Sequence, residues 1–323
     1  MKAIKIIFIT LACIVVLAVA SGMYVNFALP NTGEAEKVSI KTTPERIARG
    51  EYLANHVTVC MDCHSTRNWE LYSGPMVKES LGVGGEVFDQ SMGFPGKIYT
   101  PNITPHSLAS WTDGEILKAI TTGENKDGRA LFPLMAYPRF GKMDKEDIYS
   151  IIAYIRSLNP INSEIPATEL DFPVNLINNT LPKQASFQKI PSETDTVKYG
   201  GYLVNAAGCV DCHSKSDKGK IIEGSEFGGG MEFKFPSGTI TTPNITMHKT
   251  NGIGSWAKET FVQRFKMFAD SNYKPRNVGR TVDNTPMPWT MYAGMKTADL
   301  EAIYAYLKSL KPNDNKVEVR KFN

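Results

Sequence analysis

The sequence predicts a mainly α-helical protein in which two similar units follow an apolar N-terminal segment. Three observations predict this class: an uncharged apolar run near the N-terminus, a set of motifs that occurs twice about 150 residues apart, and helical apolar periodicity at both ends of each copy. A repeat of this length is too long for a solenoid unit and is a usual size for a complete domain.

The N-terminal segment covers residues 1–29 and carries no charge after its two lysines. It is either a signal peptide cut after Ala18-Val19-Ala20 or an uncleaved membrane anchor. We favour the anchor because Ile6 to Tyr24 alone is long enough to cross a hydrocarbon core. Lys2 and Lys5 predict that the N-terminus stays in the cytoplasm and that the rest of the chain lies outside.

Each repeat contains the pattern Cys-x-x-Cys-His, once as Cys60-Met61-Asp62-Cys63-His64 and once as Cys209-Val210-Asp211-Cys212-His213. This pattern is the attachment signature of a c-type haem. One helical turn places both thiols where they can form thioethers with the two vinyl groups of one porphyrin, and the adjacent His can ligate the iron. A redox dithiol needs no adjacent His, and a zinc site would need further ligands nearby. The sequence therefore predicts two covalently bound haem c groups.

The repeat extends beyond these motifs. Thr100-Pro101-Asn102-Ile103-Thr104 corresponds to Thr242-Pro243-Asn244-Ile245-Thr246, and Trp111 corresponds to Trp256. Apolar periodicity predicts a helix before each motif and another at the end of each repeat. These helices run from Pro44 to Val59 and from Asp147 to Leu158 in the first repeat, and from Val197 to Ala207 and from Asp299 to Leu310 in the second. The expected divisions are a membrane anchor or signal segment (1–29), a linker (30–43), a first domain (44–158), a Pro-rich connector (159–193), a second domain (194–314) and a short polar tail (315–323).

This order of motifs resembles the class I cytochrome c domain, specifically the tandem domains of membrane-bound multihaem cytochrome subunits that serve periplasmic alcohol and aldehyde dehydrogenases. The resemblance covers about residues 44–158 and 194–312. It implies two tandem class I cytochrome c domains after an N-terminal transmembrane helix. In that fold the first and last helices cross close to the haem edge. The glycine and aromatic residues that match this contact are Gly50 with Tyr154, and Gly200 with Tyr306.

Each iron needs a sixth ligand, and methionine is the favoured type. Aligning the final helices by an offset of 152 pairs Met135 with Met287, and Met143 with Met295. Met143 and Met295 stand immediately before the last helix, where an apolar residue ordinarily packs into the core. Met135 and Met287 lie in Pro-containing segments that resemble the ligand-presenting loop of the family. The resemblance thus implies His64 and Met135 on the first iron, and His213 and Met287 on the second.

Histidine competes for the same role. His106 and His248 both follow Asn-Ile-Thr by the same step, and together they would make both haems bis-histidine. The resemblance favours methionine, because that position usually carries an acidic residue over the propionate side. His56 has no equivalent in the second repeat, and we expect it to be an exposed helical residue.

The resemblance also places a polar group near the haem propionates. An amide, a hydroxyl and an indole N–H would supply the donors that a buried carboxylate needs. The alternative is a turn followed by a core Trp, and both interpretations stay open for the Asn and Thr. The residues are Asn102, Thr104 and Trp111 in the first repeat, and Asn244, Thr246 and Trp256 in the second.

A saturated His/Met shell leaves no site for substrate and favours a relatively high potential. The sequence therefore predicts an electron-transfer protein rather than an enzyme. It would relay single electrons in a periplasmic respiratory or dehydrogenase chain, anchored to a bacterial inner membrane with both domains in the periplasm. The alternative is a dihaem redox enzyme. A peroxidase needs an open or releasable sixth position, and a thiosulfate dehydrogenase needs a cysteine ligand, for which this chain has no candidate outside the anchor.

Charge bears on the partners. The formal net charge is only +3, aromatic residues are spread along the chain and no basic motif recurs, so nucleic acid binding is disfavoured. The second repeat has 31 residues from Trp256 to Met287, against 24 from Trp111 to Met135, and its longer segment is basic. We expect an acidic redox partner to dock there. The basic residues are Lys258, Arg264, Lys266, Lys274, Arg276 and Arg280.

Overall fold

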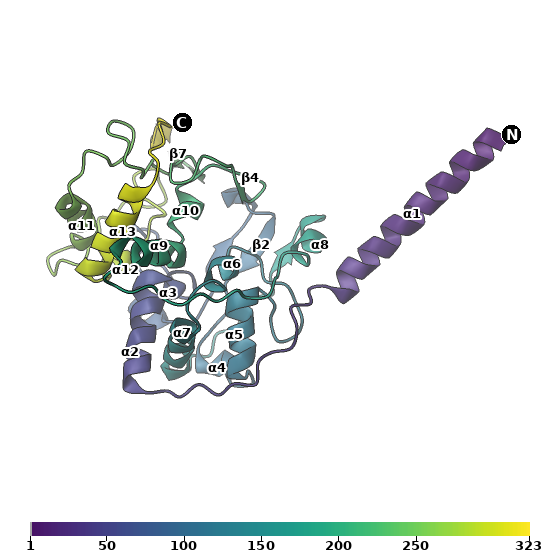
Figure 1. The fold of residues 1–323 in the computed structure, drawn as a ribbon, viewed down its shortest axis with the longest axis horizontal. Coiled ribbons are helices and arrows are strands. Elements are labelled where there is room, and N and C mark those ends of the chain that lie inside the picture. The colour runs from purple at the N-terminus through teal and green to yellow at the C-terminus, as the bar shows by residue number, and fades with distance from the viewer. Residues whose placement is uncertain (1) are drawn as a thin grey trace.

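The computed structural model describes residues 2–323, and one long helix stands apart from the remainder of the chain (Figure 1). This helix, α1 (Lys2–Ala28), has 27 residues and buries none of them. At about 1.5 Å per residue it is about 40 Å long, which exceeds the roughly 30 Å of a hydrocarbon core. Its length and composition fit a membrane span, and a signal sequence near an N-terminus would share both.

The first repeat consists mainly of short helices gathered around the pair α2 and α7 (Figure 1). Its helices are α2 (Pro44–Tyr52), the π-helical turn η1 (Leu53–Val57), α3 (Cys60–Cys63), the 3₁₀ turns η2 (Lys78–Ser80) and η3 (Gln90–Met92), α4 (Pro105–Leu108), α5 (Asp113–Thr122), α6 (Tyr137–Phe140) and α7 (Lys145–Ser157). Strands β1 (Val87–Phe88) and β2 (Gly96–Tyr99) pair antiparallel. The connector that follows adds β3 (Glu169–Leu170), which pairs with β2, and α8 (Val174–Asn178).

The second repeat has the same order around the pair α9 and α13. Its helices are α9 (Thr196–Ala207), α10 (Cys209–Cys212), α11 (Lys258–Lys266), α12 (Trp289–Tyr292) and α13 (Thr297–Ser309). Its strands are β4 (Ser216–Asp217), β5 (Lys220–Ile221), β6 (Glu232–Phe235) and β7 (Gly238–Thr241). The four long helices predicted from periodicity are confirmed, with α7 and α13 each beginning two residues earlier than expected.

Local sequence signals set the ends of these helices. Thr43 caps α2 with its side chain, and Thr112 and Glu115 form a reciprocal capping box at the start of α5. Helices α5 and α9 both end at a left-handed glycine, Gly123 and Gly208. The chain can therefore reverse direction at these points without the steric cost that a side chain would add.

The first and last helices of each repeat touch backbone to backbone at a glycine. A Cβ placed on Gly50 would collide with the carbonyl oxygen of Ser150 and lie 2.8 Å from the Cβ of Tyr154. A Cβ on Gly200 would collide with a carbonyl oxygen of α13 and lie 3.0 Å from the Cβ of Tyr306. The predicted contacts of Gly50 with Tyr154 and of Gly200 with Tyr306 are confirmed.

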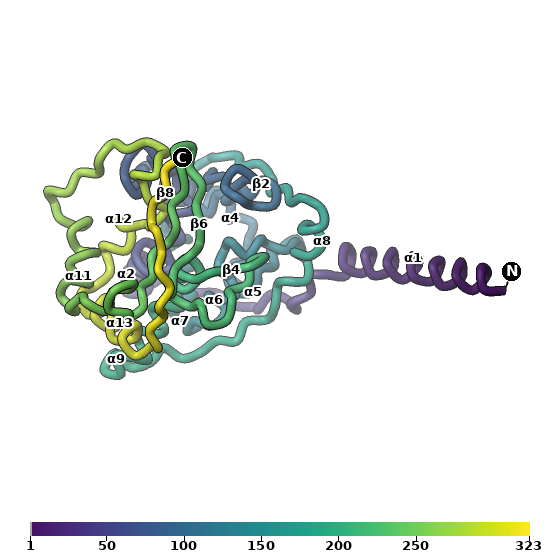
Figure 2. Tube along the Cα trace, turned by 90° about the horizontal axis from the view of Figure 1, so that it is seen from above, coloured from purple at the N-terminus to yellow at the C-terminus, as the bar shows by residue number. Residues whose placement is uncertain are grey.

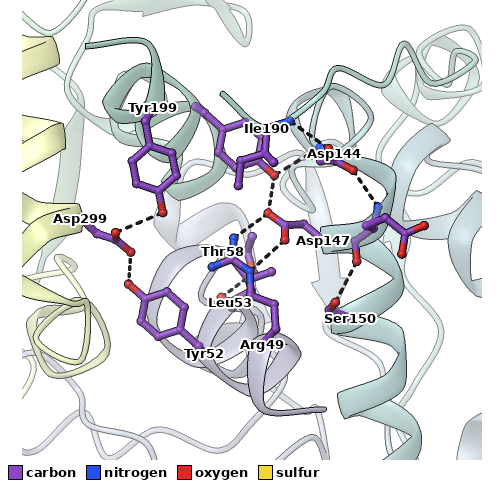
Figure 3. A network of polar contacts seen from close by, with 12 residues as sticks. Arg49, Tyr52, Leu53, Thr58, Asp144, Asp147, Ser150, Ile190, Tyr199 and Asp299 are labelled. Carbon is purple, nitrogen blue, oxygen red and sulfur yellow. Dashed lines mark hydrogen bonds and ion pairs between the residues drawn. The ribbon is translucent and has the colours of Figure 1, made fainter. Parts of the chain in front are cut away.

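The two repeats meet through matched tyrosine–carboxylate contacts (Figure 3). Tyr202 of the second repeat donates a hydrogen bond to Asp147 of the first (2.6 Å), and Tyr52 of the first donates one to Asp299 of the second. The four residues occupy equivalent places, because each tyrosine lies on the first helix of its repeat and each aspartate in the first turn of the last helix. The interface is thus close to a twofold arrangement of the two copies.

The second partner of each carboxylate breaks this symmetry. Arg49 donates two hydrogen bonds to Asp147, at 2.9 and 2.8 Å, whereas Tyr199 donates one to Asp299, at 3.1 Å (Figure 3). Asp147 therefore sits in a charged pair, while both of these donors to Asp299 are neutral phenols.

Both flanking segments are more structured than expected. The C-terminal residues, expected to be a polar tail, end in β8 (Arg320–Phe322), which pairs antiparallel with β7 and lies along the second repeat (Figure 2). The linker contacts the first repeat: the backbone N–H of Thr32 donates to Glu124 (2.8 Å), and that of Ile40 donates to Asp113 (2.8 Å). Strand pairing holds the C-terminal residues, and polar contacts hold the linker. A prediction from apolar periodicity cannot detect either kind of contact.

Candidate haem-binding cavity

One cavity of about 1930 Å³ receives both Cys-x-x-Cys-His motifs. Pockets for single ligands usually measure roughly 300–1,000 Å³, so this cavity has room for more than one such group. The motif residues on its wall are Cys60, Cys63 and His64 from the first repeat, and Cys209, Cys212 and His213 from the second.

The attachment turns are built alike. In each repeat the two cysteines begin and end a four-residue helix, α3 or α10, so that both thiols lie one turn apart on the same side. The residue before the first cysteine has left-handed backbone, at Val59 (φ 46°) and at Gly208 (φ 71°). Glycine adopts this conformation readily, whereas for the β-branched Val59 it is strained.

Both motif histidines are oriented by their second ring nitrogen. Nδ1 of His64 donates to the carbonyl oxygen of Pro101 (2.8 Å), and Nδ1 of His213 donates to that of Pro243 (2.8 Å). Each prolyl carbonyl therefore selects the tautomer whose Nε2 is free to ligate a metal. Burial lowers the pKa of each imidazole, which keeps the ring in the neutral form that a metal requires.

The motif thiols do not resemble a redox pair. Burial raises the pKa of the Cys60, Cys63 and Cys209 thiols, to about 12 for Cys63 and Cys209. Redox-active Cys-x-x-Cys pairs instead have lowered thiol pKa values. Within residues 2–323 there is also no group of three or more His, Cys, Asp or Glu side chains suited to a metal ion, as a zinc site would need.

Met135 and Met287 line the cavity, from the segments that precede α6 and α12. Met143 is fully buried away from the cavity, and Met295, also buried, reaches its wall. Neither His106 nor His248 is among the cavity-lining residues. The geometry thus favours Met135 and Met287 over the histidine pair as candidates for the sixth ligand.

The Asn and Thr that recur in both repeats are held by hydrogen bonds to the backbone and to each other. The side-chain amide of Asn102 donates to the carbonyl oxygen of Ile161 (2.8 Å), and its oxygen accepts hydrogen bonds from the N–H and hydroxyl of Thr104 (both 2.8 Å). Asn244 contacts Asn313 and Thr246 in the same way. These contacts fasten the turn to the chain beyond the last helix of each repeat.

The two tryptophans differ in position. Trp256 lines the cavity, as does Asn244, whereas Trp111 lies outside it and packs against the hydrophobic core, with Lys126 over its ring at 5.6 Å. The contact of these polar side chains with the haem propionates remains a prediction. In the second repeat, Asn244 and Trp256 are placed to make it, because both line the cavity.

A side chain of the first repeat also reaches the motif of the second, which the sequence did not reveal. Arg139, just after the Met135 segment, forms an ion pair with Asp211 of the second motif. The buried Tyr292 lines the same cavity and donates to the carbonyl oxygen of Ala207 (2.7 Å), just before the second motif. Both side chains therefore lie next to the second attachment turn.

The expectation for His56 is wrong. Its ring is half-buried between the repeats, with Nδ1 2.8 Å from the carbonyl oxygen of Met291, and Gly294 lies close beside it. The absence of an equivalent in the second repeat reflects this contact between repeats, which only one copy of the helix makes.

The chain is mainly helical, and its two Cys-x-x-Cys-His turns open into a large cavity with oriented histidines and candidate methionine ligands. These features together define a c-type haem protein. The family model for cytochrome c matches residues 197–311, so this part of the chain is similar to a cytochrome c domain. A cytochrome c domain implies covalently bound haem c. The residues present fit that group: two thiols one turn apart, an oriented neutral imidazole and a methionine on the wall of the same cavity.

The chain is also similar to cytochrome subunits of dehydrogenases. It is 27% identical to the cytochrome c subunit of the quinone alcohol dehydrogenase of Gluconobacter oxydans, over 77% of this chain and 51% of the relative. It is 27% identical to the fructose dehydrogenase cytochrome subunit of Gluconobacter japonicus, over 82% and 52%. A dihaem c-type cytochrome of Cereibacter sphaeroides is 26% identical, over 66% and 71%. The chain thus spans about half the length of the two dehydrogenase subunits.

Proposed function

We propose that the chain is a two-haem electron-transfer cytochrome serving a periplasmic dehydrogenase, with one class I cytochrome c domain in each repeat. The main support for this proposal is that both attachment motifs and both loop methionines line one cavity. Similarity to subunits of alcohol and fructose dehydrogenases supports the role of an electron acceptor for such an enzyme. Helix α1 anchors the chain in the inner membrane and leaves both repeats in the periplasm.

The residues of the chain carry out two tasks in this role. His64 and Met135 would hold one haem iron and His213 and Met287 the other, while the two cysteine pairs would tether the porphyrins. A haem with a His/Met shell accepts and releases one electron and has a relatively high potential. With both coordination positions filled by the protein, the site exchanges electrons without binding a substrate.

Packing of the repeats supports transfer between the two sites. Both attachment turns open into one cavity, whose wall includes Arg139 of the first repeat and Tyr292 of the second. The reciprocal contacts of Tyr52 and Tyr202 hold the two repeats in one orientation. An electron entering one repeat therefore reaches the other without a domain movement.

An acidic redox partner docks on the second repeat. Of the six basic residues in its longer segment, Lys274, Arg276 and Arg280 are exposed. The others are engaged: Arg264 lies over the Trp289 ring, Lys266 donates to the carbonyl oxygen of Ala293 (3.1 Å), and Lys258 pairs with Glu301 (3.2 Å). The docking patch is therefore the exposed trio rather than the whole segment. Arg280 also lines the cavity, which places this patch at its edge.

Mass spectrometry of the membrane-extracted chain tests the core of this proposal. We expect two haems, one on the peptide that contains Cys60 and Cys63 and one on the peptide that contains Cys209 and Cys212. A single haem would refute it. Carbon monoxide should bind the reduced protein poorly, because both iron positions are filled. Ready binding at one haem would favour a peroxidase-like enzyme instead.

A further inference from the structure

A loop of the first repeat, residues 67–74, reaches the segment of the second repeat that carries Met287. We call it the cross-repeat loop. Ser73 at its end is fully buried, and its hydroxyl donates to the carbonyl oxygen of Met287 (2.6 Å) while accepting the N–H of Trp289 (3.0 Å). One side chain of the first repeat thus binds the backbone on both sides of Pro288.

Further contacts fix this loop against the second repeat. The backbone N–H of Ser73 donates to Oδ1 of the fully buried Asn284 (2.8 Å), whose amide donates to the carbonyl oxygens of Trp69 (2.9 Å) and Gly279 (2.8 Å). The N–H of Tyr72 donates to the carbonyl oxygen of Arg276 (2.8 Å). The loop and the extra segment of the second repeat are therefore paired like two short strands.

The same loop is tied to the first attachment motif. Arg67 donates to Asp62 of that motif (2.9 Å) and to the carbonyl oxygens of Ser73 and Gly74 (both 2.8 Å). The side chains of Arg67 and Asp62 are only 6% and 9% exposed. A buried ion pair resists disruption, because removing one partner leaves a charge uncompensated. A continuous path of polar contacts thus runs from the first haem-attachment turn to Met287.

The backbone of Ser73 indicates that its position is imposed. Its φ of 68° is left-handed, a conformation that is uncommon without glycine and that persists where the surroundings over-determine it. The Met135 segment has a different support. The N–H of Met135 donates to the carbonyl oxygen of Phe132 (3.1 Å), and the carbonyl of Met135 accepts from Tyr137 (2.5 Å), both within its own segment. The Met287 carbonyl accepts the equivalent internal bond from Trp289 (2.8 Å), and the Ser73 hydroxyl adds a contact from the other repeat.

We propose that Ser73 is a positioning residue for the axial methionine of the second haem, so that the first repeat completes the ligand set of the second. This inference rests on the proposed function. A thioether binds iron only if its backbone is held at the right distance and angle. The Ser73 hydroxyl contacts both the Met287 carbonyl and the Trp289 amide, which are also hydrogen-bonded to each other (2.8 Å). Its removal leaves the segment without the side-chain hydrogen bonds that fix it to the first repeat.

The test uses the full-length two-haem protein and the sulfur-to-iron absorption of its ferric haems. Ser73→Ala should weaken this absorption at the haem that Met287→Ala affects. It should also let carbon monoxide bind that haem about tenfold better, as expected when a buried hydrogen bond is lost. The first haem should be unchanged. Ser73→Gly relieves the backbone strain but also lacks the hydroxyl, so it should behave in the same way.

Ser80→Ala is the matched control. The Ser80 hydroxyl donates to the carbonyl oxygen of Val77 (2.6 Å) and accepts the N–H of Thr66 (2.9 Å), all within the first repeat. It should leave both haems unaltered. Hydrogen exchange of the Trp289 amide gives a second measurement, which should speed up in both Ser73 variants and not in the control.

The inference fails if both Ser73 variants keep wild-type absorption, carbon monoxide binding and Trp289 exchange in a protein whose second haem is methionine-ligated. A wild-type protein whose second haem lacks methionine ligation would overturn the ligand assignment of the proposed function together with this inference. The two failures are therefore distinguished by the spectrum of the wild-type protein.

Discussion

The two methionine-bearing segments occupy equivalent places in their repeats but differ in what holds them. Both segments are closed by hydrogen bonds within themselves, and the segment around Met287 is in addition bound by Ser73 of the other repeat. Arg139 of the first repeat also contacts Asp211 in the second attachment motif. The second site therefore depends on the first repeat more than the first site depends on the second. Similar sequence motifs do not imply equal structural independence.

The sharpest test of this asymmetry removes one haem at a time. Cys60→Ser with Cys63→Ser should cost the first haem and also weaken methionine ligation of the second, because Asp62 and Arg67 would no longer hold the cross-repeat loop. Cys209→Ser with Cys212→Ser should cost the second haem and leave the Met135 ligation intact. Absorption of the remaining haem measures the difference. Equal losses from the two pairs would contradict the asymmetry.

Changing the ligands themselves should affect one haem each. Met135→Ala and Met287→Ala should each remove the sulfur-to-iron absorption of one ferric haem and lower its potential. Met143→Leu and Met295→Leu are conservative controls that should cost less than about 1.5 kcal/mol of stability and keep both spectra. Potentiometric titration checks the result. Loss of the absorption in a control variant would show that the ligand assignment is wrong.

Removing the tyrosine donors of Asp299 should lower the free energy of unfolding more than removing the tyrosine donor of Asp147. Tyr52→Phe combined with Tyr199→Phe leaves Asp299, only 3% exposed, without its two phenol donors. An uncompensated buried charge costs about 3–5 kcal/mol. Tyr202→Phe should cost about 1.5–3 kcal/mol, because Asp147 keeps Arg49. Denaturant unfolding of the two-haem protein compares them, and a larger loss from Tyr202→Phe would reverse the expected order.

Alkaline pH should weaken the same interface. Burial, followed by the hydrogen bond to Asp299, raises the pKa of Tyr52, and burial together with Asp147 raises that of Tyr202. Their stabilisation is complete below about pH 10, the pKa of an unfolded tyrosine, and is lost as pH rises towards the higher folded value. Between about pH 10 and the folded pKa, the tyrosine is deprotonated in the unfolded chain but still protonated in the folded one. The free energy of unfolding therefore falls by about 1.4 kcal/mol per pH unit for each tyrosine. Unfolding measured from pH 9 to 11 should show a shallower fall in Tyr52→Phe with Tyr202→Phe than in the wild type.

Patterns along the chain predicted what local and repeated interactions control. Periodicity located the four long helices, and repetition identified Met135 and Met287, which both line the cavity. Contacts between the repeats carry no such pattern. Ser73 has no motif, and His56 shows only that it lacks an equivalent, so neither could be recognised before the repeats were placed together.

The extra length between Trp256 and Met287 was a real signal with an incomplete interpretation. It was attributed to partner docking, but residues 276–279 pair with residues 70–72 of the first repeat. Arg264 and Lys266 turn towards the second repeat rather than outwards. A difference in length between repeats indicates that the longer segment makes an additional contact. It does not indicate whether that contact is with another protein or within the same chain.

The exposed trio should give the smallest effect, on association rate alone. Reversing the charges of Lys274 and Arg280 should slow electron exchange with an acidic redox partner about tenfold at low salt and leave both haem spectra unchanged. Exposed charges are screened over about 10 Å at 0.1 M salt, so the difference should vanish at high ionic strength.

Arg276 lies over the Tyr72 ring of the cross-repeat loop, 5.4 Å from its centroid, and its reversal should add a spectral change at the second haem. Reversal of the exposed Lys308 and Lys311, outside this segment, is the control with the same change in net charge. Rates that ignore both the salt and the Lys274 and Arg280 reversals would remove the patch from docking, and an Arg276 variant with unaltered spectra would separate the patch from the asymmetry between the repeats.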